Sequence, residues 1–187
     1  MNYYERPTAL LQERAYNEAR QHFAEHLNQF KANCDAIHNI ESNLPATTND
    51  VSRAALQSSG RIIQTDDGTQ WQHAVDLTKI TSVCHRHTPA GLEFAVVECL
   101  PMKSGELKEV LNSGHNASEV LQTFARDQRQ VLNLWKSDVT AQIREHLEEK
   151  YPQQDMSIVV ESFDIKLARD ISRQETLAQN HSHGVRV

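Results

Sequence analysis

Ten of the 187 residues are histidine, and two groups of them have the spacing of metal ligands. The first group, His22-Phe-Ala-Glu-His26, has the form HxxEH. On a helix this spacing places two imidazole rings one turn apart, where they can share a metal ion, and Glu25 between them could activate a bound water molecule. A zinc site needs a third protein ligand, and the helical wheel places both rings at the edge of an apolar stripe. The motif therefore favours boundary histidines over a catalytic centre.

The second group is the pair His85 and His87, which a single residue separates. Residues two apart on a strand face the same side, so this pair could also bind one metal ion. If the chain turns tightly over 88–91, His85 lies across from Phe94 and His87 across from Leu92, which favours packed or rim histidines. A site that combines this pair with His22, His26 or His73 is left open as a second form of the metal hypothesis.

The remaining motifs point away from chemistry. His146 lies in register with the apolar face of a long helix, which is typical of a core or interface histidine. Asp35-Ala-Ile-His38 has the spacing of half a di-iron site, but no Glu-x-x-His mate occurs on the second long helix, so we reject that site. Nucleotide-binding and serine-hydrolase motifs are absent from the sequence. His181 and His183 fall in a segment that we expect to be a solvated tail.

Composition limits the class of protein. The formal charge of −6 disfavours broad electrostatic attraction to nucleic acids or membrane surfaces, so we expect neither as a partner. Trp71 and Phe94 could form a base-stacking surface, but neighbouring acidic residues favour a place for them in the core. No apolar run approaches the length of a membrane span or a signal peptide, which predicts a cytoplasmic protein. The three cysteines are expected to be reduced, buried thiols, because they are odd in number and never form a CxxC pair.

Two long amphipathic helices must carry most of the core. The first is predicted over 7–44 and the second over 116–151, each from apolar residues at spacings of three and four. Pro45 is interpreted as a stop signal, followed by a break over 45–49 and a short helix over 51–56. The first stripe contains Tyr16, Ala19, Phe23, Leu27, Phe30, Cys34 and Ile37, and the second contains Val120, Leu121, Phe124, Val131, Leu132, Trp135, Val139 and Ile143.

Between these helices the pattern changes to that of strands. The region 61–100 contains two hairpins, with turns at Asp66-Asp67-Gly68 and at 88–91. We predict a short helix over 104–111, a fifth strand over 156–163, a helix from 164 to about 179, and a tail over 180–187. The length favours a single domain, 1–187.

The predicted fold is therefore α+β, with two long amphipathic helices and shorter helices packed on a small, mainly antiparallel sheet of about five strands. Long apolar stripes without a convincing catalytic pattern favour a non-enzymatic protein that binds another protein or itself through helix and sheet surfaces. Such proteins include adaptors, secretion chaperones, inhibitors and assembly components. No cofactor or metal is expected on this hypothesis. The alternative is a metal-dependent hydrolase that uses Glu25 with His22, His26, His85 and His87.

Overall fold

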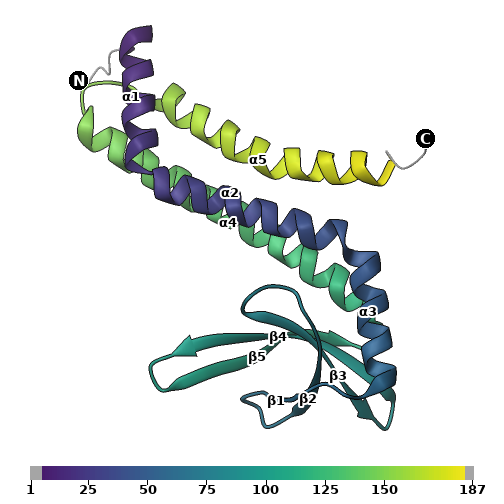
Figure 1. The fold of residues 1–187 in the computed structure, drawn as a ribbon. Helices are drawn as coiled ribbons and strands as arrows, with labels where there is room; N and C mark the ends of the chain where they lie inside the picture. The colour runs from purple at the N-terminus through teal and green to yellow at the C-terminus, as the bar shows by residue number, and fades with distance from the viewer. Residues whose placement is uncertain (1–5, 184–187) are drawn as a thin grey trace. The chain divides into compact units, whose positions relative to one another are not determined.

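A computed structural model describes residues 6–183 of the chain, with side chains described for residues 6–172. It confirms the α+β class and the antiparallel sheet of five strands (Figure 1). No helix in this part of the chain is long and apolar enough to span a membrane. The helices are α1 (Ala9–His22), α2 (Ala24–Ser42), α3 (Leu44–Gln57), α4 (Ala117–Lys150) and α5 (Ser157–His183), and the strands are β1 (Ile62–Gln64), β2 (Gln70–Asp76), β3 (Thr81–Thr88), β4 (Gly91–Met102) and β5 (Gly105–Gly114).

The residues separate into two compact units. The helical unit combines Met1–His38 with Arg129–Val187, and the sheet unit is Asn39–Gln128. Their boundaries fall inside α2 and α4. That the two units fold together as one domain stays a prediction, and each unit is described by itself below.

In the helical unit, α4 contacts both α2 and α5. Phe30 of α2 meets the Trp135 ring edge to face at 5.6 Å between centroids. On the other side, Asp164 of α5 lies 3.6 Å from the Lys136 ammonium group, and the Ile171 carbonyl accepts a hydrogen bond from Arg129. Most residues of the predicted stripes thus belong to a core, but Val131 of the second stripe is 51% exposed. The buried members of this core include Ala15, Ala19, Phe23, Leu27, Phe30, Ile37, Leu132, Val139, Ile143, Leu147, Val160, Phe163 and Leu167.

The prediction of one helix over 7–44 is wrong, because the helix breaks twice. Phe23 leaves helical geometry with φ −100° and ψ 16°, and the chain changes direction there, between α1 and α2 (Figure 1). The second break is at Asn43, and Pro45 stands at the start of α3 instead of ending a helix. Proline fits the first turn because the N–H group that it lacks would have no helical partner there. The break expected over 45–49 is therefore the first part of α3, and the helix predicted over 51–56 is its continuation.

The sheet is a meander with the order β1-β2-β3-β4-β5. Both predicted hairpin turns are confirmed, and their glycines, Gly68 and Gly91, have φ values of 89° and 114° that other residues rarely adopt. The helix predicted over 104–111 is wrong, because this segment is β5 and the β-hairpin region extends to Gly114. Gly105 turns the chain with φ 129°, and cross-strand pairing with β4 then overrides the local helical preference of Glu106 to Leu111.

The fifth strand predicted over 156–163 is also wrong, because these residues begin α5. Met156, Val159 and Phe163 recur at helical spacing and are all buried. Asp155 fixes the start of the helix by accepting a hydrogen bond from the Ser157 backbone N–H at 3.0 Å. The helix predicted from 164 belongs to the same element, which continues through His183 and replaces the first part of the expected tail. Residues 184–187 lie outside the described part of the chain.

The sheet curls until its first turn meets its last strand. The Asp66 N–H donates to the Lys108 carbonyl at 2.9 Å, which links the β1–β2 turn to β5. One face of the curled sheet encloses an apolar cluster formed by Ile63, Trp71, Cys84, Ala95 and Val97, with Cys99 and Val110 packed against it.

Candidate functional site

The helix break at Phe23 divides the HxxEH motif. His22 is the last residue of α1, whereas Glu25 and His26 lie in the first turn of α2. All three side chains are exposed. The motif thus does not occupy one continuous helix, and the one-turn spacing assumed for its two imidazole rings does not apply.

His22 pairs instead with His146 of α4. Their rings stack with centroids 4.2 Å apart and an angle of 17° between the planes, and Phe23 meets the His146 ring edge-on at 5.4 Å. Nitrogen lone pairs lie in the plane of each ring, so two parallel rings do not direct them at a common point between the rings. The pKa of His146 is lowered, mainly by burial and then by His22. This contact is a packed helix boundary, and His146 is half-buried in it.

An ion-pair cluster lies one helical turn away from the stacked rings. The Glu18 carboxylate of α1 accepts a hydrogen bond from the Tyr151 hydroxyl at 2.7 Å and lies 2.5 Å from the Lys150 ammonium group. Hydrogen bonds to Lys150 and then Tyr151 lower the pKa of Glu18. Sequence reasoning missed this cluster, because no local pattern relates Glu18 to residues more than 130 positions further along the chain.

The two histidines of the second pair, His85 and His87, differ in burial. The predicted register is confirmed, with His85 opposite Phe94 and His87 opposite Leu92. His85 is completely buried, and both of its ring nitrogens lack a hydrogen-bond partner in the described residues, whereas His87 is exposed. Burial is the main cause that lowers the pKa of His85, and His87 adds to it. His85 is therefore a neutral core side chain.

No group of three or more histidine, cysteine, aspartate or glutamate side chains in the described residues has the arrangement of a metal site. The side chains of His181 and His183 lie outside the described ones. Two thiols are deeply buried, and desolvation raises the pKa of Cys34 to about 11 and that of Cys84 to about 12. Both are therefore protonated at neutral pH and are poor nucleophiles.

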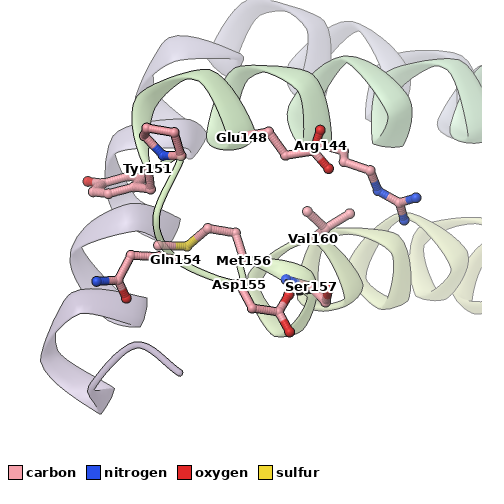
Figure 2. Close-up of a pocket in the computed structure, with 9 residues that line it drawn as sticks. Arg144, Glu148, Tyr151, Gln154, Asp155, Met156, Ser157 and Val160 are labelled. Atoms are coloured by element: carbon pink, nitrogen blue, oxygen red, sulfur yellow. Dashed lines mark hydrogen bonds between the residues drawn. The ribbon is translucent and has the colours of Figure 1, made fainter. Parts of the chain in front are cut away.

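A pocket of about 410 Å³ opens where α4 turns into α5 (Figure 2). Met156 and Val160 provide apolar walls, and Arg144 and Glu148 of α4 provide charged groups at the rim. The Ser157 hydroxyl, which could act as a nucleophile, donates to Asp155 at 2.5 Å. Hydrogen bonds from Ser157 lower the pKa of Asp155, so the pair acts as a helix cap with an ionised carboxylate. The pocket can hold a small polar group, but the lowered pKa of Asp155 makes this carboxylate a weak base toward the serine.

A second depression, of about 400 Å³, lies between α1 and α5. Its lining includes Ala9 and Tyr16 of α1 and Ile158 of α5. Below it, the Tyr16 ring stacks on Phe163 at 4.4 Å between centroids. The exposed fractions of Ile158 and of Leu10, which follows Ala9, are 55% and 79%. This groove therefore has apolar side chains both in its lining and next to it.

The aromatic side chains considered for base stacking are not accessible. Trp71 and Phe94 are both buried, which agrees with their expected place in the core. Comparison of the chain with protein-family models, curated proteins and solved structures finds no match.

Proposed function

We propose that the protein acts by binding another protein, or a second copy of itself, through apolar side chains on the surface of its helical unit. The observation that carries this proposal is the exposure of three large apolar side chains on the two helices that line the groove: Leu10 of α1, and Ile158 and Ile165 of α5. Their exposed fractions are 79%, 55% and 43%. Ile158 and Ile165 are seven residues apart on α5 and so lie on the same side of the helix.

Exposed apolar side chains at helical spacing support a helix-to-helix or helix-in-groove contact, because burying them removes apolar area from water. A second place of the same kind is on α4, where Val131 and Leu134 are 51% and 69% exposed. Adaptor, chaperone, inhibitor and assembly roles all fit such surfaces. A cytoplasmic location belongs to the same proposal.

The test places a photo-reactive amino acid at Ile165 in the native host and identifies the protein that it cross-links. Binding of the purified partner is then measured with wild type, with Ile158→Asp combined with Ile165→Asp, and with Ile62→Asp as a matched control. Ile62 is 58% exposed but belongs to the sheet unit. We expect the double variant to weaken binding by about tenfold or more, as loss of about 1.4 kcal/mol of apolar contact would, and the control to bind normally.

Equal binding by all three proteins would contradict the proposal, as would the absence of any cross-link above that from an exposed polar position such as Arg20. Light scattering of wild type and the double variant identifies the case in which the partner is a second copy. Self-association that the double variant loses supports that form of the proposal.

A further inference from the structure

The β4–β5 hairpin extends past the rest of the sheet. Strand β3 pairs with β4 as far as Glu98, and the Cys99 N–H still donates to the Ile80 carbonyl at 2.7 Å, so the residues from Leu100 to Met102 have a strand partner on one side alone, in β5. Directly opposed residues of an antiparallel pair share a face, as do residues two apart on one strand. One face of this arm therefore carries Glu98, Leu100 and Met102 from β4 with Leu107 and Glu109 from β5, and we call it the acidic arm face.

Two carboxylates are placed directly across from each other on this face. Glu98 pairs with Glu109, and like charges in that position destabilise a sheet. Neither carboxylate makes an ion pair or a hydrogen bond within the described residues. The opposite face differs, because Glu106 there has the Lys108 ammonium group 4.0 Å away. The arm thus holds uncompensated negative charge on one side only.

Apolar side chains continue the same face toward the tip of the hairpin. Leu100 and Leu107 oppose each other and remain partly exposed, and Met102 is 57% exposed. A flexible thioether suits contacts with side chains of varied shape. The sheet unit as a whole has seven lysine and arginine residues against eleven aspartate and glutamate residues, a formal charge of −4. A positively charged partner is therefore also attracted from a distance.

We infer that the acidic arm face docks a basic, apolar segment of a partner protein, whose lysine or arginine side chains lie between Glu98 and Glu109 while its apolar side chains cover Leu100, Leu107 and Met102. This inference rests on the proposed function and names the chemistry of one partner segment. The bound cation relieves the repulsion between the two carboxylates, so binding also stabilises the hairpin. Uncharged or acidic segments gain only the apolar part of this contact.

The test uses fluorescent peptides of about eight residues and the full chain. In the first peptide every second residue is serine and the positions between them hold two lysines followed by two leucines, so that an extended chain presents both kinds of side chain on one face. In the second peptide glutamate replaces lysine, and in the third serine replaces leucine. Fluorescence anisotropy measures their affinity for wild type, for Glu98→Gln combined with Glu109→Gln, for Met102→Ser, and for Glu106→Gln as the matched control on the opposite face.

We expect only the first peptide to bind well, and the double variant to weaken its binding by about fivefold with loss of most of the salt dependence. Met102→Ser should weaken binding and Glu106→Gln should leave it unchanged. Equal binding of the acidic peptide, or an equal loss in Glu106→Gln, would overturn the inference. Failure here together with cross-linking at Ile165 refutes the arm as a docking face but leaves the proposed function standing, because that experiment depends on the helical unit.

Discussion

Replacement of His85 by leucine should stabilise the sheet unit, and the gain should grow as the pH falls. At neutral pH the variant removes two buried ring nitrogens that lack a partner in the described residues. An unpaired buried polar group costs about 1–3 kcal/mol. A small mismatch in shape offsets part of this gain, so we expect the free energy of unfolding to rise by about 1–2 kcal/mol at pH 7.

The pH dependence follows from the direction of the pKa shift. Burial holds the pKa of His85 below its ordinary 6.5, so in acid the unfolded state binds a proton that the folded state resists. The free energy of unfolding of wild type therefore has its full value above pH 6.5 and declines as the pH falls below it. Wild type therefore loses free energy of unfolding as the pH falls from 7 to 5. The leucine variant lacks this loss, whereas His146, whose pKa is also lowered, contributes equally to both proteins.

Urea denaturation at pH 7, 6 and 5 measures the effect. Trp71 reports on the sheet unit in a Trp135→Phe background, and the exposed His87→Gln serves as the control, with a change expected within about 0.5 kcal/mol. A leucine variant that is less stable than wild type at pH 7 by more than about 1 kcal/mol would refute the reasoning. A leucine variant whose free energy of unfolding falls between pH 7 and pH 5 as steeply as that of wild type would also refute it.

Three further predictions follow from contacts in the two units. Phe30→Ala removes a fully buried ring that contacts Trp135 and should lower the free energy of unfolding by about 3–5 kcal/mol. Calorimetry should then show a large drop in Tm, and an unchanged Tm would contradict the packing of α2 on α4. Gly60→Ala places a Cβ 1.8 Å from the His73 carbonyl oxygen, whereas the Cβ of Gly68→Ala meets open space and is disfavoured only by a φ of 89°, at about 1 kcal/mol. We therefore expect lower expression and a lower Tm for Gly60→Ala than for Gly68→Ala, and the reverse order would contradict this backbone. Dialysis against EDTA should leave Tm unchanged, whereas a drop that zinc reverses, and that His22→Ala with His26→Ala abolishes, would restore the metal hypothesis.

Periodicity in the sequence located the helical core because burial repeats every three or four residues. Phe23, Phe30 and Ile37 are buried as predicted, whereas Tyr16 of the same stripe is only half-buried. The strands β2 and β4 begin where the turn signals at Asp66-Asp67-Gly68 and Gly91 predict. The break at Phe23 gave no signal, since no proline or glycine accompanies it. Apolar spacing is the same on both sides of such a break, so a stripe of this kind does not reveal it.

Two further errors, the helix predicted over 104–111 and the strand predicted over 156–163, arose from opposite local preferences. Residues 106–111 contain good helix formers, yet pairing with β4 makes them a strand. Ile158, Val159 and Val160 are β-branched, yet burial of Val159 and Val160 with Phe163 makes them a helix. The candidate sites failed for a related reason. His22 meets His146, and Glu18 meets Tyr151, through contacts that depend on how whole helices pack, and one sequence carries no record of that.

The link between Asp66 and Lys108 also affects how this sheet behaves among other chains. An edge strand with free N–H and C=O groups is a template on which a second chain can add a strand and begin aggregation. At Lys108 the backbone N–H of Asp66 occupies the carbonyl, and the Asp66 carboxylate faces the Lys108 N–H at 3.4 Å. A single turn residue thus takes the place of a neighbouring strand and adds a negative charge at the same point. Curling the sheet onto its own first turn therefore blocks the addition of a further strand to β5 at Lys108.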